Sequence, residues 1–157
     1  MPDAPSLLPA RDRDVVGTAL QGTLTDLLHL AATAKQAHWN LYGPRFRPVH
    51  LQLDDIVETA RTLADTVAER AATIGFAPDG RPSTTADTGA SADLPAGPVA
   101  DTDVVAAFTT AVGASSARIR RRIADTEGLD PVSQDLLVAT AAALEKHHWM
   151  LRAENTG

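Results

Sequence analysis

The chain contains no cysteine, and aromatic residues make up only 4% of its 157 residues. The absence of cysteine excludes a disulfide framework and a thiolate metal site, and it is compatible with a reducing cytoplasm. No apolar run reaches the roughly 18 residues that a membrane-spanning helix needs, and the N-terminal stretch lacks the basic and apolar regions of a signal peptide. These absences predict a soluble, cytoplasmic protein with no membrane partner.

Positive charge is also scarce. The 14 lysines and arginines against 20 acidic residues give a net charge of −6, and the only lysines are Lys35 and Lys146. Neighbouring arginines occur at Arg118, Arg120, Arg121 and Arg122. Because they spread around a predicted helix, we interpret them as a solvated or salt-bridged face. This balance argues against a large electrostatic footprint for nucleic acid, and cations are the more natural partners.

Apolar and small residues recur every three or four positions along four stretches, which is typical of amphipathic helices. We expect helices over about residues 12–41, 47–74, 101–127 and 131–152. Gly75 and Gly128 follow the second and third helices, where glycine commonly ends a helix. Asp130 and Pro131 fit the N-cap and first position of the last helix. No stretch shows the alternation of a strand.

Between Phe76 and Ala100 the composition shifts to Pro, Gly, Thr and Asp, which predicts a long loop with one weak helical turn. The length fits a single domain, expected over residues 12–152 with short tails at 1–11 and 153–157. Four long helices with one long crossover between the second and third predict an all-α, ferritin-like four-helix bundle.

Metal-ligand side chains occur at regular offsets in the first half of the chain. They are His38, His50, Asp54, Asp65 and Glu69. The last four form two pairs, and the members of each pair are four residues apart, so each pair projects from one face of the second helix. Two imidazoles and three carboxylates suit Fe(II), Mn(II) or Zn(II), and iron is our first expectation.

The two pairs cannot hold the same metal ion. From His50 to Asp65 is 15 residues, which is about 22 Å of helix rise, whereas metal–ligand bonds are about 2 Å long. Either each chain carries two half-complete sites, or a second chain completes each one. We hypothesise a two-fold dimer in which an antiparallel copy of the helix completes two intersubunit sites about 22 Å apart.

These residues occur within longer motifs: Lys35-x-x-His38-Trp39-Asn40, Gly43, Phe46, His50, Asp54, Asp65, Ala68-Glu69-Arg70, and Leu144-Glu145-Lys146 before Trp149. In order and spacing the chain resembles the Dps family of mini-ferritins, the DNA-protection-during-starvation proteins. The resemblance covers essentially everything except the tails and the 76–100 loop. It implies that the five ligands form a ferroxidase centre at a dimer interface, that twelve chains close into a hollow shell, and that hydrogen peroxide is the preferred oxidant.

The chemistry that this resemblance implies is the storage and detoxification of iron. Two Fe(II) ions that share one peroxide release no hydroxyl radical, and the Fe(III) product enters the cavity as a mineral, which protects the cell from oxidative damage. Because the ligands must be deprotonated to bind, we expect activity to fall as histidines protonate in acid. Ligand chemistry alone leaves open that Zn or Mn occupies the site, which would make the protein a metal buffer.

Further side chains are candidates for supporting roles. Trp39 is a candidate radical sink beside the metal, although a helix tryptophan more often serves packing. Asp55 and Glu58 are candidates for iron nucleation on the cavity side. Asp130 and Asp135 match acidic positions near the start of the family's last helix and are candidates for a negative pore. The alternative for each carboxylate is a solvated side chain or, for Asp130, an N-cap alone.

The last helix contains Glu145-x-x-His148, the spacing of di-iron sites inside helix bundles. Such a centre needs a second copy of the motif, and the chain has none. We therefore interpret His148 as a core histidine on an apolar stripe, and His147 and His29 as residues without a distinguishing partner.

A DNA-compacting protein is the rival function. DNA-binding members of the family usually carry lysine-rich tails, whereas the first 14 residues have two arginines against three aspartates, and the last seven have one arginine and one glutamate. We therefore expect no direct DNA binding.

Overall fold

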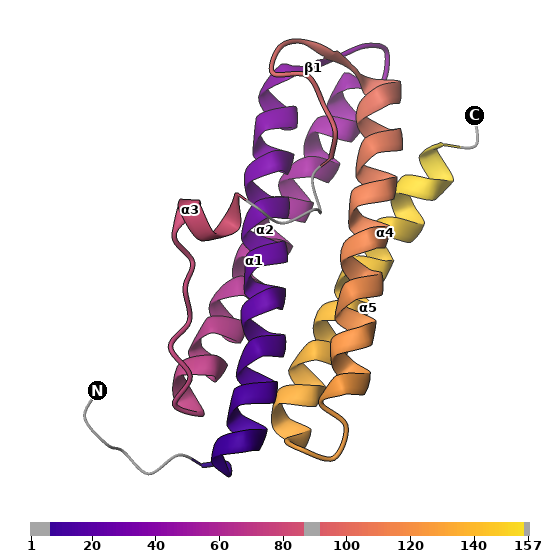
Figure 1. Cartoon of the computed structure of the whole chain (residues 1–157). Helices are drawn as coiled ribbons and strands as arrows, with labels where there is room; N and C mark the ends of the chain where they lie inside the picture. Colours follow the sequence, from indigo (N-terminus) through magenta and orange to yellow (C-terminus); the bar gives the residue numbers. More distant parts are fainter. Residues whose placement is uncertain (1–6, 87–91, 156–157) are drawn as a thin grey trace.

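Four long helices run along a common bundle axis (Figure 1). The structure, a computed structural model, describes residues 7–86 and 92–155. Its long helices are α1 (Ala10–Asn40), α2 (Phe46–Thr73), α4 (Asp101–Asp125) and α5 (Pro131–Glu154). The prediction of an all-α bundle with a long crossover between its second and third long helices is confirmed, and within the described residues no helix is long and apolar enough to cross a bilayer.

The crossover carries more structure than the sequence predicted. Its helical turn is α3 (Pro82–Thr85), and its residues 87–91 lie outside the described residues, as do 1–6 and 156–157 of the expected tails. Two short strands that the sequence pattern did not indicate are also present, since β1 (Leu41–Tyr42) pairs in parallel with β2 (Val99–Ala100). Strands of two residues are too short to show alternation in the sequence.

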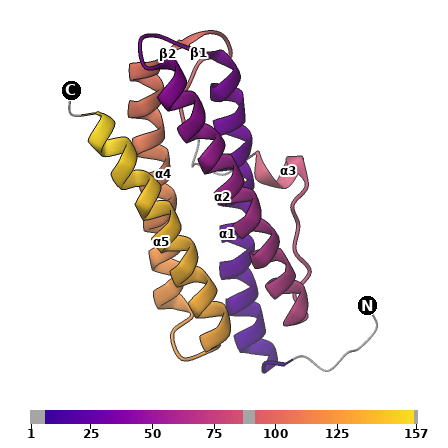
Figure 2. The same ribbon diagram turned by 180° about the vertical axis from the view of Figure 1, so that it is seen from behind.

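The bundle is built from two helical hairpins. Figure 2, the view from behind, shows α1 beside α2 and α4 beside α5, and these two pairs make the most extensive contacts. Most apolar side chains of the first two helices lie in the core, and Leu28, Leu63 and Ala68 pack against it partly buried. The largest fully buried side chains come from all four long helices and include Phe108, Leu20, Leu27, Leu53, Ile56, Ile119, Leu137 and Leu144.

The predicted helix ends are also present. Gly75 and Gly128 adopt positive φ angles of 82° and 73° just beyond α2 and α4. The Asp130 carboxylate caps α5 by accepting a hydrogen bond of 3.2 Å from the backbone N–H of Ser133. The observed ends differ from the expected ones by up to two residues, since α4 stops at Asp125 and α5 continues to Glu154.

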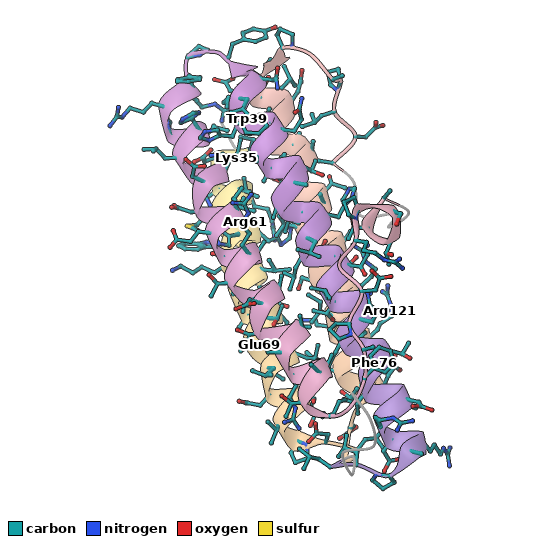
Figure 3. The ribbon with its side chains drawn as sticks, turned by 90° about the vertical axis from the view of Figure 1, so that its left-hand side faces the viewer. Lys35, Trp39, Arg61, Glu69, Phe76 and Arg121 are labelled. Atoms are coloured by element: carbon teal, nitrogen blue, oxygen red, sulfur yellow. The ribbon has the colours of Figure 1, made fainter. Side chains whose placement is uncertain are left out.

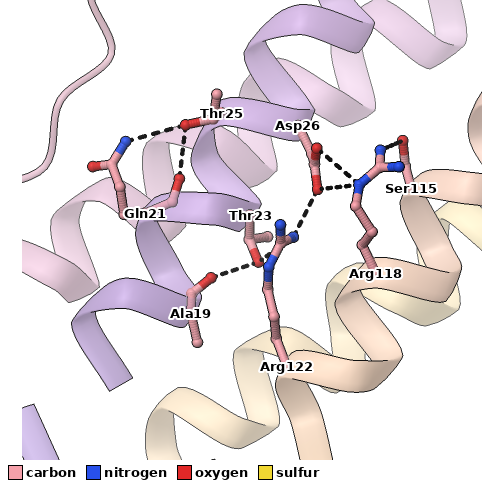
Figure 4. Close-up of polar contacts among 8 residues, drawn as sticks. All are labelled: Ala19, Gln21, Thr23, Thr25, Asp26, Ser115, Arg118 and Arg122. Atoms are coloured by element: carbon pink, nitrogen blue, oxygen red, sulfur yellow. Dashed lines mark hydrogen bonds and ion pairs between the residues drawn. The ribbon is translucent and has the colours of Figure 1, made fainter. Parts of the chain in front are cut away.

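A buried carboxylate ties the two hairpins together (Figure 4). Asp26 of α1 is 2% exposed and accepts hydrogen bonds from Arg118 Nε at 3.1 Å and from Arg122 NH1 at 2.7 Å, both on α4. Arg120 pairs with Glu145 of α5, and Arg121 is exposed. The interpretation of the arginine run as a salt-bridged and solvated face is confirmed.

The prediction of His148 as a core histidine is wrong, because the structure buries His147 instead. Both ring nitrogens of His147 lie 3.0 Å from side-chain atoms of α2, namely Gln52 Nε2 and Thr59 Oγ1. Burial lowers the pKa of His147, although the nearby Asp55 carboxylate opposes this effect. His147 is therefore a neutral polar link between α5 and α2.

Candidate metal centre

The turn that joins α1 to α2 sets two helix ends side by side. Gly43 adopts φ 135°, and a Cβ at this position would lie 2.5 Å from Asp101 Oδ2, so the turn requires glycine. The same carboxylate oxygen, buried at the start of α4, accepts a hydrogen bond of 2.6 Å from the backbone N–H of Arg45. Pairing of β1 with β2 fixes the other side of the turn. The ends of α1 and α2 are therefore held in place by α4.

Three of the predicted ligands meet at this junction. His38, His50 and Asp54 offer ligand atoms that all lie within 4.8 Å of one another, and no other such group occurs in residues 7–86 and 92–155. The two imidazole rings stack with centroids 3.6 Å apart and planes 22° apart. His38 is buried, while His50 and Asp54 are partly exposed, so the cluster opens toward solvent.

Backbone hydrogen bonds set the tautomer of both histidines. His38 Nδ1 lies 3.1 Å from the His50 carbonyl oxygen, and His50 Nδ1 lies 3.1 Å from the His38 carbonyl oxygen. Since a carbonyl can only accept, Nδ1 carries a proton in both rings, so in the neutral form of each imidazole Nε2 has the lone pair that a metal needs. The reciprocal bonds orient both rings before any metal arrives.

Asp54 is ionised and already holds a cation. Lys35 Nζ lies 2.5 Å from Asp54 Oδ1, and the hydrogen bond from Lys35 holds the pKa of Asp54 below its usual value against the opposing effect of burial. His38 Nδ1 lies 3.3 Å from the same oxygen. The sequence placed Lys35 in a motif but did not reveal this contact, which joins residues 19 positions apart.

Asp65 and Glu69 do not join this cluster within the chain. Both are exposed on α2. Figure 3 shows Glu69 far along the bundle from Lys35 and Trp39. The five predicted ligands therefore do not meet inside one chain, and only His38, His50 and Asp54 of the five come together.

Four large apolar or aromatic side chains close to the ligands in the sequence are exposed, namely Trp39, Tyr42, Phe46 and Leu51. Trp39 is 69% exposed, so it does not pack within its own chain. The Phe46 ring lies 4.9 Å from the His50 ring, measured between centroids. An apolar rim next to an incomplete ligand set is typical of a surface that a partner covers.

The carboxylates predicted as nucleation or pore residues differ in how far they are buried. Asp55, Glu58 and Asp135 are exposed carboxylates. Asp130 is buried and pairs with Arg70 NH2 at 2.7 Å in addition to capping α5. Burial alone would raise the pKa of Asp130, but hydrogen bonds from Ser133 and Arg70 outweigh it and lower the pKa. Asp130 therefore has a structural role in this chain.

Comparisons with known proteins agree with the fold. Residues 17–156 match the family model of the ferritin-like domain. A DNA protection during starvation protein of Mycolicibacterium smegmatis is 39% identical over 144 residues, which cover 88% of this chain and 75% of that protein. The DNA protection during starvation protein 2 of Deinococcus radiodurans is 37% identical over 135 residues, covering 86% of this chain and 56% of that protein. The chain therefore spans little more than half of the Deinococcus relative.

The backbone fold also matches that of a solved Dps structure. The tetragonal form of Mycobacterium smegmatis Dps superposes with a TM-score of 0.90 at 35% sequence identity, covering 96% of this chain and 94% of that one.

Proposed function

Because the chain belongs to the Dps family of mini-ferritins, we propose that it is a ferroxidase that oxidises Fe(II) and stores the Fe(III) product inside a hollow homo-oligomer. The observation that carries this proposal is the cluster of His38, His50 and Asp54, with its ligand atoms within 4.8 Å. Two imidazoles and a carboxylate suit Fe(II), which is the substrate of this site and passes through it.

A second copy of the chain supplies the missing ligands. Asp65 and Glu69 are exposed on the same helix as His50 and Asp54, and each lies 15 residues, or about 22 Å, beyond its counterpart in that first pair. A two-fold axis across antiparallel α2 helices brings these carboxylates to the partner's histidines and creates two equivalent sites. The exposed Trp39, Tyr42, Phe46 and Leu51 support this arrangement, since a second copy would cover them. In the full assembly twelve such chains enclose the mineral.

Hydrogen peroxide is the oxidant that fits this purpose. Each of two Fe(II) ions gives one electron to one peroxide molecule, the O–O bond breaks, and two protons are taken up to form two waters. Fe(II) and hydrogen peroxide, which together generate hydroxyl radical, are thus consumed in the same step. The ionised Asp54 and the two imidazole ligands stabilise the Fe(III) charge that develops.

The test is anaerobic loading of the assembled protein with Fe(II), followed by a hydrogen peroxide pulse while ferric absorbance is recorded. The native protein should oxidise iron rapidly at about one peroxide per two iron, and Asp65→Asn should lose the fast phase. Glu127→Gln, which alters an exposed carboxylate beyond the end of α4, is the matched control and should behave as native. Equally slow oxidation in native protein and Asp65→Asn would refute the proposal.

We propose that protection works through iron and not through DNA binding. The net charge is −6, and the arginines of α4 at positions 118, 120 and 122 are engaged by Asp26 and Glu145. A gel shift at physiological salt with micromolar protein should leave DNA unretarded. Retention of DNA under these conditions would contradict this part of the proposal.

A further inference from the structure

The ligand positions of α2 belong to a longer polar stripe on that helix. Two further charged side chains, Glu58 and Arg61, lie between the two ligand pairs. At 100° per residue from His50, Arg61 falls at about 20° and Glu58 at about 80°, within the arc of about 0–100° that the four ligands span. All six side chains therefore project from one side of the helix. With spacings of four, four, three, four and four residues, the stripe consists of His50, Asp54, Glu58, Arg61, Asp65 and Glu69.

Glu58 and Arg61 have no partner within the part of the chain that the structure describes. Both side chains are exposed, and neither makes an ion pair or a side-chain hydrogen bond with any described residue. Residues three apart on a helix can pair with each other, but these two do not. Figure 3 shows Arg61 between Lys35 and Glu69 along the bundle. Two opposite charges therefore stand unpaired midway between the two halves of an incomplete site.

The spacing of the stripe is symmetric about one point of the helix. In the antiparallel dimer proposed above, the first ligand pair of each copy lies opposite the second ligand pair of the other copy. The two-fold axis then crosses the stripe at its midpoint, between Thr59 and Ala60. Glu58 and Arg61 are equally far from this midpoint. The register that aligns the ligands therefore also places Glu58 of each copy opposite Arg61 of the other.

The charges of the stripe also favour a cation at this point. The stripe carries four carboxylates in each copy, so eight of them face one another in the dimer. Arg61 is the only lysine or arginine from His50 to Glu69. Like charges opposite one another across an interface oppose association, whereas opposite charges fix the register. The planar guanidinium of arginine also has the geometry to bind a carboxylate through two parallel hydrogen bonds.

We propose that Glu58 of each copy forms an ion pair with Arg61 of the other, and that these two reciprocal pairs fix the register in which Asp65 and Glu69 reach the partner's histidines. This inference rests on the proposed function, because it takes the intersubunit site as its premise. It assigns Glu58 to the subunit interface in place of iron nucleation. Glu58 and Arg61 are positioning residues, since they act on metal binding only through the alignment of the two helices.

Charge reversal distinguishes a pair between copies from a pair within one chain. Glu58→Arg leaves a chain with positive charge at both positions, and Arg61→Glu leaves a chain with negative charge at both. Each variant alone brings like charges together at the two-fold axis, so the concentration below which its assembly dissociates should rise about tenfold or more. Co-expression of the two variants should restore association and fast iron oxidation, because both pairs across the axis of a mixed dimer join opposite charges. A pair within one chain cannot produce this recovery, since neither variant carries opposite charges at the two positions.

Sedimentation velocity over a concentration series measures association, and the anaerobic peroxide pulse measures iron oxidation. Arg121→Glu, the same charge reversal at an exposed position of α4, is the matched control and should assemble as native. Single variants that assemble as native, or a mixture that recovers no association, would overturn the ion pairs. In that case fast oxidation by native protein would leave the proposed function intact. Slow oxidation by native protein would instead refute the proposed function, and recovered association in the mixture would still support the pairing.

Discussion

Lys35 and Asp54 form an ion pair at the candidate metal centre, with Lys35 Nζ 2.5 Å from Asp54 Oδ1. The ammonium holds the carboxylate ionised and in place, but it occupies Oδ1, one of the two oxygens that can bind a metal ion. Iron that binds Asp54 through this oxygen must displace Lys35. This competition means that Lys35 both prepares the site and weakens its affinity for metal.

Replacement of Lys35 should tighten iron binding. Lys35→Met keeps the apolar stem and removes the competing charge, so Fe(II) affinity should rise about two- to fivefold, the range expected for loss of a partly exposed ion pair. Anaerobic calorimetric titration at neutral pH measures the effect. Lys146→Met, which alters the other lysine at an exposed position of α5, is the control. Unchanged or weaker binding in Lys35→Met would show that Lys35 is purely structural.

Two inactive variants should restore activity when mixed in one assembly. In the proposed arrangement each site combines His38, His50 and Asp54 of one chain with Asp65 of its partner. A mixed dimer of His50→Ala and Asp65→Asn chains therefore has one site that carries both substitutions and one site in which every ligand is native. Random pairing in a co-expressed sample then restores about a quarter of all sites. Peroxide-driven iron oxidation measures the recovery.

The control for this experiment is co-expression of His50→Ala with Asp54→Asn. These two substitutions damage the same half of the site, so every site in the mixed dimer stays broken. Recovery in both mixtures, or in neither, would rule out the proposed intersubunit arrangement.

Removal of the Asp26 carboxylate should destabilise the fold. Asp26→Asn leaves the guanidinium groups of Arg118 and Arg122 without their counter-charge between α1 and α4. Loss of one member of a buried ion pair costs about 3 kcal/mol or more, which should appear as a lower melting temperature at neutral pH. Arg121→Gln, on the same helix but exposed, should change stability by less than about 0.5 kcal/mol. Equal melting temperatures for the two variants would contradict this role of Asp26.

The sequence predicts what depends on local spacing. The four long helices follow from apolar residues every three or four positions, and the ends at Gly75, Gly128 and Asp130 follow from capping chemistry. Helical spacing does not choose between the third and fourth position after Leu144, so it does not tell whether His147 or His148 faces the core. Gln52, which binds His147, is 95 residues away in the sequence.

The metal centre was likewise only partly predictable. His38, His50 and Asp54 are recognisable as ligands by residue type and spacing, and they do come together. The contact of Lys35 with Asp54 depends on how separate segments meet in space, so it leaves no periodic signal in the sequence.

The Asp130 carboxylate should make stability depend on pH. Its pKa in the folded chain is below the ordinary value of 3.8, so folding favours the ionised form. The resulting stabilisation is fully present above pH 3.8 and is lost as the pH falls below it toward the lowered pKa. Asp130→Asn still caps α5 but removes the counter-charge of Arg70, which keeps only its hydrogen bond to Ser133. The loss should cost about 1–3 kcal/mol at neutral pH.

Thermal unfolding of native protein and Asp130→Asn from pH 7 down to pH 3 measures this effect. The difference in melting temperature should be largest at neutral pH and should shrink below about pH 4. A difference that is independent of pH would mean that the Asp130 ion pair with Arg70 contributes nothing. Glu127→Gln, at an exposed position, should follow the native protein throughout.

A methyl group at Gly43 should damage the metal centre as well as the fold. Gly43 and Gly128 both have positive φ, of 135° and 73°, but a Cβ at Gly43 would meet the Asp101 carboxylate at 2.5 Å, whereas a Cβ at Gly128 would meet nothing within 4 Å. Gly128→Ala should therefore cost only the backbone strain of about 1 kcal/mol and leave Fe(II) binding unchanged. Gly43→Ala should cost more and weaken Fe(II) binding, because displacement of Asp101 frees the turn that sets His38 beside His50. Melting temperatures and Fe(II) titrations of Gly43→Ala and Gly128→Ala measure the two effects. An equal loss of iron affinity in both variants would show that the loss follows from general destabilisation and does not arise at the turn.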